Sequence, residues 1–180
     1  GKFAFHIQMF GINEQGESCS ILVNDYKPFF YVKIGNDWNY SKCLEFKEYI
    51  KTEARVRDEI EFEIVDHKKL YGFSGGKKHK FIKFQFNNSV SMNNAKRMWC
   101  KFSSINNITY SNLDTEIYES SIPPLLRYFH IENISPSGWV QISKKYLIQN
   151  EKDTRCTYEY VCGKSGVKPI SEKETIVPFK

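Results

Sequence analysis

Residues 117–142, IYESSIPPLLRYFHIENISPSGWVQI, contain the strongest local structural signals in the chain. Tyr118 and Glu119 end an extended run. Pro123 and Pro124 suit the first turn of a helix, because the N–H that proline lacks has no partner there. This part of the segment therefore predicts the end of a strand followed directly by a short helix.

The second half of the same segment predicts the helix body, a turn and a strand. Leu125, Leu126 and Phe129 form a short apolar face at helical spacing. The sequence SPSG at 135–138 is typical of a turn, and WVQI at 139–142 is typical of a strand. We expect Arg127 to make a structural ion pair or carbonyl contact and Trp139 to lie in the core.

The N-terminal third predicts an antiparallel meander. Apolar residues alternate over 3–9, and NEQG at 13–16 is a hairpin turn in which Gly16 is free to take positive φ. A return strand follows over 19–23. Residues 29–34 are apolar on both faces, which predicts a central strand.

The middle of the chain predicts two helices that alternate with strands. Ser41 can cap a helix through about residue 54, and a second helix begins at Asn88 or Ser89. Strands are predicted near 60–64 and 81–86, and later near 155–160, with 167–170 as its returning partner. The fold class is therefore α+β, with mixed, largely antiparallel sheets and three short-to-medium helices.

Composition indicates an intracellular domain without membrane segments. The 180 residues carry a net charge of +5, which permits a polyanionic partner without requiring one. The five cysteines are odd in number and none forms a CxxC pair, so we interpret them as reduced thiols rather than a disulfide or zinc framework. No apolar run reaches membrane length.

A lysine-rich stretch at 67–83 is the candidate nucleic-acid-binding element. It contains six lysines and no acidic residue around a glycine-rich loop. One interpretation is contact with phosphates, with an aromatic side chain available for stacking. The other is a solvated hairpin that is merely rich in lysine. The candidate binding residues are Lys68, Lys69, Lys77, Lys78, Lys80, Lys83 and Tyr71. The strand KFIKF at 80–84 also resembles the central strand of an RNA-recognition motif.

The chain carries no recognisable catalytic or metal-binding motif. Its four histidines are far apart and HExxH is absent. Glu116 and Glu119 are close in sequence, but nuclease and polymerase metal sites need carboxylates that converge from several strands. We predict no catalytic residue and no metal or other cofactor within these residues.

The motif YESxIP, the following RYF and the GW strand resemble the N-terminal domain of family B DNA polymerases. The closest likeness is to delta-type enzymes of large DNA viruses of eukaryotes, and the strand KPFFYV at 27–32 adds to it. The resemblance runs through most of the chain. The residues that carry it as a structural motif are Pro28, Phe29, Tyr31, Tyr118, Glu119, Pro123, Arg127 and Trp139.

The resemblance implies a module of a larger enzyme. In that family the domain precedes a 3′–5′ exonuclease domain, frames the exonuclease and polymerase modules and lines the path of the single-stranded template. It implies a domain over 1–175, with sub-lobes near 1–110 and 111–175, and a lead-in to the exonuclease at 176–180. The parent enzyme would use Mg²⁺, act on DNA and work in the host nucleus or at a cytoplasmic viral replication site. The alternative is a free-standing single-stranded nucleic-acid-binding or protein-interaction domain.

Overall fold

The computed structural model describes residues 4–67, 79–101, 107–110 and 113–171 and divides the chain into two compact units. Unit 1 comprises residues 1–4 and 27–122, and unit 2 comprises residues 5–26 and 123–180. This division differs from sub-lobes at 1–110 and 111–175, because the first two strands of the chain join a strand near its end. Within the described ranges, no helix is long and apolar enough to span a membrane.

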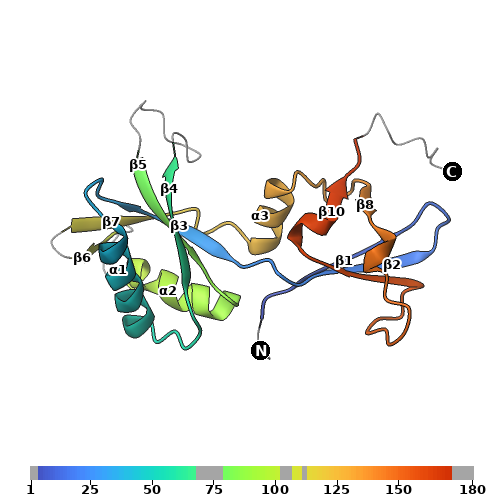
Figure 1. Ribbon diagram of the computed structural model, residues 1–180, viewed down its shortest axis with the longest axis horizontal. Coiled ribbons are helices and arrows are strands. Elements are labelled where there is room, and N and C mark those ends of the chain that lie inside the picture. The colour runs from blue at the N-terminus through green and yellow to red at the C-terminus, as the bar shows by residue number, and fades with distance from the viewer. Residues whose placement is uncertain (1–3, 68–78, 102–106, 111–112, 172–180) are drawn as a thin grey trace. The chain divides into compact units, whose positions relative to one another are not determined.

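Unit 1 is built on a five-stranded antiparallel sheet of order β4-β5-β3-β7-β6 (Figure 1). The predicted central position of the third strand is confirmed, since β3 pairs with β5 on one side and β7 on the other. The strands are β3 (Phe29–Ile34), β4 (Glu61–His67), β5 (His79–Gln85), β6 (Asn107–Tyr110) and β7 (Leu113–Tyr118), and the helices are α1 (Tyr40–Glu53) and α2 (Ser89–Lys101).

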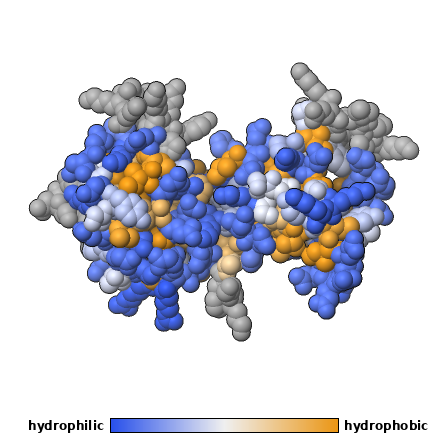
Figure 2. Space-filling model, viewed as in Figure 1, coloured by the Kyte–Doolittle hydropathy of each residue, from blue (hydrophilic) through white to orange (hydrophobic). Residues whose placement is uncertain are grey.

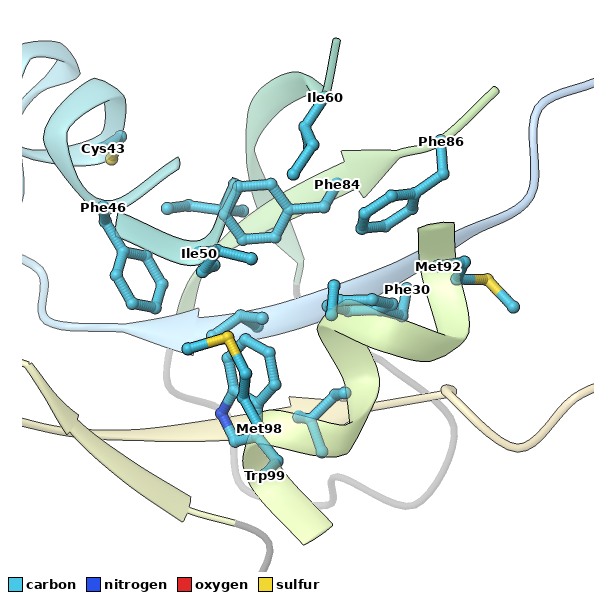
Figure 3. Packing of buried hydrophobic residues seen from close by; sticks show 14 of the residues in the cluster. Phe30, Cys43, Phe46, Ile50, Ile60, Phe84, Phe86, Met92, Met98 and Trp99 are labelled. Atoms are coloured by element: carbon cyan, nitrogen blue, oxygen red, sulfur yellow. The ribbon is translucent and has the colours of Figure 1, made fainter. Parts of the chain in front are cut away.

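One face of this sheet packs against both helices and forms the core of unit 1. Phe30 and Phe84 of the sheet pack together with Phe46 of α1 and Trp99 of α2 (Figure 3). The centre of the Trp99 ring lies 5.7 Å from that of Phe30 and 6.4 Å from that of Phe46. All four side chains are fully buried. Burying aromatic side chains of this size supplies the main favourable term for folding the unit.

The two helices of unit 1 begin at asparagine caps. Asn39 Oδ1 accepts a hydrogen bond from the Lys42 amide at 2.9 Å, so the predicted cap at Ser41 is wrong by two residues. Asparagine and serine cap equally well, and the sequence offers both. Asn88 Oδ1 accepts from the Ser91 amide at 2.8 Å, which confirms the predicted start of the second helix.

Unit 2 contains a three-stranded sheet, a two-stranded sheet and one α-helix. The hairpin predicted at residues 13–16 joins β1 to β2, and Gly16 has φ of +80°. The other edge of β2 pairs in parallel with β9, while β8 pairs with β10. The elements are β1 (Ile7–Ile12), β2 (Ser18–Val23), α3 (Pro124–Ile131), β8 (Val140–Ile142), β9 (Tyr158–Cys162) and β10 (Val167–Pro169), with 3-10 turns η1 (Lys144–Tyr146) and η2 (Lys164–Gly166).

The prediction that 167–170 returns as the partner of 155–160 is wrong. After β9 the chain enters η2, where the Lys164 amide donates to Asp25 Oδ1 and the Lys164 carbonyl accepts from the Tyr128 hydroxyl at 3.0 Å. These contacts hold η2 in a conformation that does not turn the chain back beside β9. Strand β10 therefore pairs with β8 instead of β9.

Residues 117–142 form the predicted strand, helix, turn and strand, but the burial of their side chains differs from expectation. Pro124 occupies the first turn of α3 as predicted. Leu126 is 53% exposed, whereas Arg127 and Tyr128 are the buried residues of the helix. Trp139 is half-buried rather than part of the core, so that prediction is wrong. A helix as short as α3 can bury only a few side chains, and those it buries are the amphipathic Arg127 and Tyr128 rather than its leucines.

Candidate nucleic-acid interface

The candidate interface is the face of the unit 1 sheet that carries neither α1 nor α2. Side chains alternate between the two faces of a strand, so Phe29, Tyr31 and Lys33 of β3 lie opposite the core residues Phe30 and Val32. We call this side of the sheet the open face. The Phe29 ring is buried on this face, whereas Tyr31, Lys33 and Lys83 are half-buried. The face therefore offers an aromatic ring beside basic side chains, a combination suited to bases and phosphates.

Residues of three strands lie side by side on the open face. Tyr31 is paired with Lys83 of β5 on one side and with Tyr118 of β7 on the other. The Lys83 ammonium lies 4.4 Å from the centre of the Phe29 ring, a cation–π contact. The Phe29 and Tyr31 rings meet edge to face at 5.5 Å. These contacts hold the side chains in defined positions on the sheet.

The acidic residues of the same face limit its positive charge. Lys33 is paired with Glu116, and Lys83 is paired with Glu63 on its other side. Opposite charges across neighbouring strands attract one another. The open face is therefore mixed in charge, and its ability to hold nucleic acid rests on its aromatic residues as well as on its lysines.

Tyr118 is a neutral tyrosine at any physiological pH. Burial is the main cause that raises the pKa of its hydroxyl, and the neighbouring Glu116 carboxylate raises it further. Its ring meets that of the buried Phe81 edge to face at 5.5 Å. Tyr118 therefore packs against Phe81 through its ring and keeps its hydroxyl protonated.

The predicted lysine-rich element is only partly visible. Lys68, Lys69, Tyr71, Lys77 and Lys78 lie outside the described residues. The structure places the remaining two candidates, Lys80 and Lys83, on β5.

The two described lysines of that element have different environments. Lys80 is half-buried, and its ammonium donates a hydrogen bond to the Trp38 carbonyl at 2.6 Å. Lys83 lies on the open face beside Phe29. Only Lys83 shares a surface with aromatic residues suited to stacking.

The eight motif residues do not form one site. Pro28, Phe29, Tyr31, Tyr118 and Glu119 belong to unit 1, while Pro123, Arg127 and Trp139 belong to unit 2. Phe29 and Tyr31 lie on the open face together with Tyr118. In unit 2 the side chain of Arg127 is buried, which agrees with a structural role rather than a surface contact.

Sequence reasoning missed Lys33 as a candidate. It is the one lysine of β3 and follows Tyr31 at the spacing that places both on one face of the strand. Among the described residues, no group of three or more His, Cys, Asp or Glu side chains is arranged to hold a metal ion.

Comparisons with known proteins point to one enzyme class. A family model for the DNA polymerase family B exonuclease domain matches residues 115–180, which include most of β7 and all of unit 2 except residues 5–26. A DNA polymerase of Phaeocystis pouchetii virus is 40% identical over 97% of this chain. The chain is similar to part of a family B DNA polymerase. It spans 18% of that viral enzyme's length.

Other relatives agree with this similarity. A DNA polymerase of Acanthamoeba polyphaga mimivirus is 27% identical over 97% of this chain, which covers 11% of that enzyme. The solved family B DNA polymerase of the archaeon Pyrobaculum calidifontis matches 88% of the chain with a TM-score of 0.58 and 16% identity, over 18% of its own length. At that identity the likeness concerns the fold, and it agrees with the α+β architecture.

Proposed function

We propose that this chain is the non-catalytic N-terminal module of a replicative, delta-type family B DNA polymerase. The observation that carries the proposal is the match to the viral DNA polymerase, which runs along 97% of this chain but covers only 18% of the viral enzyme. A module of that size leaves most of the enzyme's length to other residues, among which we propose that the catalytic carboxylates lie. The motif residues Tyr118, Glu119 and Pro123 agree with the family pattern of the N-terminal domain.

The proposed module frames the exonuclease and polymerase domains of the parent enzyme. We place the module at residues 1–175 and the lead-in to the exonuclease domain at 176–180, although the family match already begins at residue 115. The parent enzyme would add nucleotides and remove mispaired 3′ ends with Mg²⁺, and would act in the host nucleus or at a cytoplasmic viral replication site. The module itself would hold no cofactor.

The proposed partner is the single-stranded template ahead of the polymerase site. The open face supports this proposal, because Tyr31 is paired with Lys83 across the strands and shares its side of β3 with Lys33. Aromatic stacking of a base contributes about 1–3 kcal/mol and tolerates any sequence, as a replicative enzyme requires. The lysine-rich residues Lys68, Lys69, Lys77, Lys78 and Lys80, with Tyr71, are proposed to add phosphate contacts from the neighbouring segment.

The reading frame of the gene tests the proposal. We expect the codons that follow Lys180 to encode a strand with an Asp-x-Glu pair, the first metal-binding carboxylates of an exonuclease site, and then the polymerase motifs. The protein expressed from the whole frame should extend a primer in the presence of Mg²⁺. A stop codon soon after Lys180 would contradict the proposal and favour a free-standing single-stranded nucleic-acid-binding or protein-interaction domain.

A further inference from the structure

Four lysines of unit 2 gather where two distant segments of the chain meet. Lys144 and Lys145 belong to η1, Lys164 to η2 and Lys168 to β10, and all four are exposed. Strands β8 and β10 run antiparallel with Ile142 opposite Val167. Ile142 is the last residue of β8 and Val167 the first of β10. Because η1 follows β8 and η2 precedes β10, the two turns lie at the same end of this sheet. We call these four residues the η-turn cluster.

The two turns lie close together. A Cβ atom built on Gly166 of η2 would come within 3.4 Å of the Tyr146 ring of η1. The Lys145 ammonium lies 4.8 Å from the centre of the same ring. The Tyr146 ring therefore lies near η2 as well as beside the charge of Lys145.

The backbone of the cluster is fixed by hydrogen bonds. The Lys164 amide donates to Asp25 Oδ1, and its carbonyl accepts from Tyr128 Oη at 3.0 Å. In η1 the Leu147 amide donates to the Lys144 carbonyl at 3.1 Å. Tyr128 is fully buried, and burial is the main cause that raises its hydroxyl pKa, so it remains a donor. A surface that is ordered before binding loses less conformational entropy on binding.

The cluster lacks counter-charges. Within the ranges that the structure describes, none of its four ammonium groups forms an ion pair, whereas Lys47 and Lys51 of α1 both pair with Glu59. The Asp25 carboxylate lies beside η2, where its Oδ1 accepts from the Lys164 backbone amide rather than from an ammonium group. Like charges on one surface repel one another in the free protein, and a polyanion reduces that repulsion.

We propose that the η-turn cluster is a binding surface for the phosphodiester backbone of DNA, separate from the open face of unit 1. The inference rests on the proposed function, since a polymerase module meets DNA, and it adds which residues of unit 2 hold the strand. Lysine is a flexible point charge that suits phosphates and reads no base sequence. The binding is therefore independent of sequence and weakens with salt.

The test compares two variants of the 180-residue chain with equal net charge. The first, Lys144→Gln, Lys145→Gln and Lys164→Gln, removes three cluster charges, and Lys164 makes its structural contacts through its backbone. The matched control, Arg57→Gln, Arg97→Gln and Arg155→Gln, removes three exposed charges elsewhere. Fluorescence anisotropy would measure the affinity for a labelled single strand, and for the same strand in a duplex, over a range of salt concentrations. Thermal melting would establish that both variants fold.

The cluster variant should bind the single strand at least about tenfold more weakly than the wild type at low salt. The slope of log affinity against log salt concentration should also become shallower by about 2, because each lost phosphate contact removes about 0.7. The control should retain the wild-type slope. Weakening on the duplex as well identifies duplex phosphates as a second ligand of the same surface.

Two results would overturn the inference while leaving the proposed function intact. One is a cluster variant that binds DNA with the affinity and salt slope of the wild type, which would show that other residues make the phosphate contacts. The other is an equal loss in the control, which shows that only bulk charge matters. A wild-type chain that binds neither DNA form would overturn the inference and the proposed template contact together.

Discussion

The indole N–H of Trp99 donates a hydrogen bond to the hydroxyl of Thr115 at 3.3 Å, and both residues are fully buried. Trp99 lies on α2 and Thr115 on β7, so this bond joins the second helix to the sheet. A buried tryptophan usually finds such an acceptor, because leaving its N–H unsatisfied costs free energy. The helix is therefore positioned by a specific contact as well as by apolar packing.

Replacing Thr115 by valine should destabilise the chain by about 1–3 kcal/mol, because the buried indole N–H loses this acceptor while the volume of the side chain is kept. The free energy of unfolding in urea would measure the loss. Thr115→Ser retains the hydroxyl and should cost less. A Thr115→Val variant as stable as the wild type would show that this hydrogen bond contributes nothing measurable.

Replacing Phe46 by alanine should cost about 3–5 kcal/mol, because the ring is fully buried and meets Trp38 at 5.2 Å and Phe84 at 6.0 Å. Phe10, on β1 of unit 2, is 67% exposed and serves as the matched control. Figure 2 shows that apolar side chains reach the surface of the protein among the hydrophilic ones. Phe10→Ala should change stability by no more than about 0.5 kcal/mol. Thermal melting of both variants measures the difference. Comparable losses would contradict the assignment of the core.

Acid should weaken unit 1 through Glu59. Hydrogen bonds from Lys47 first, and from Lys51, lower the pKa of Glu59 from 4.5 to about 2. A carboxyl whose pKa is lowered by folding stabilises the native state above the unfolded-state pKa. That contribution disappears as pH falls from about 4.5 to about 2. It is small, because the Glu59 side chain is 58% exposed and solvent screens the pair.

Urea unfolding at several pH values would measure this contribution. The stability difference between the wild type and Glu59→Gln should be largest near neutral pH and should shrink across that acid window. Glu53→Gln, at the exposed last residue of α1, should follow the wild type throughout. A difference that stays constant with pH would show that the ion pairs contribute nothing measurable.

The purified chain should neither extend a primer nor shorten a 3′ end in the presence of Mg²⁺, because the residues that the structure describes include no group of carboxylates arranged to hold a metal ion. Gel analysis of an end-labelled primer–template would measure both activities. Activity that a substitution within residues 1–180 abolishes would contradict the assignment of a non-catalytic module.

The sequence predicted unit 1 better than unit 2 for a physical reason. Strand β3 is apolar on both faces, and α1 and α2 carry clear periodicity and capping residues, so local patterns suffice. In unit 2 the decisive pairing joins β2 to β9 in parallel, across more than a hundred residues. No local sequence pattern indicates which distant strand β2 will pair with. The hydrogen bonds of Lys164 with Asp25 and Tyr128 likewise join segments that are far apart in the sequence.

The candidate site shows the same division. The aromatic residues of β3 were predicted as residues of a structural motif and not as binding residues, and the sequence could not distinguish Lys80 from Lys83. Only the fold shows that Lys80 donates to the Trp38 carbonyl while Lys83 lies on the open face. The η-turn cluster was also invisible, because its members come from two segments that meet only in the folded unit.

The proposal that this chain is a non-catalytic polymerase module on the template path is tested most directly by photocrosslinking. The protein from the complete reading frame would be bound to a primer–template that carries a photoreactive nucleotide in the single-stranded template ahead of the primer end, or in the duplex behind it. Mass spectrometry of the digested protein would locate each crosslink. We expect the single-stranded probe to crosslink within residues 1–180, with Tyr31 and the η-turn cluster among the labelled sites. An active polymerase whose template probes label only residues beyond 180 would contradict the proposal.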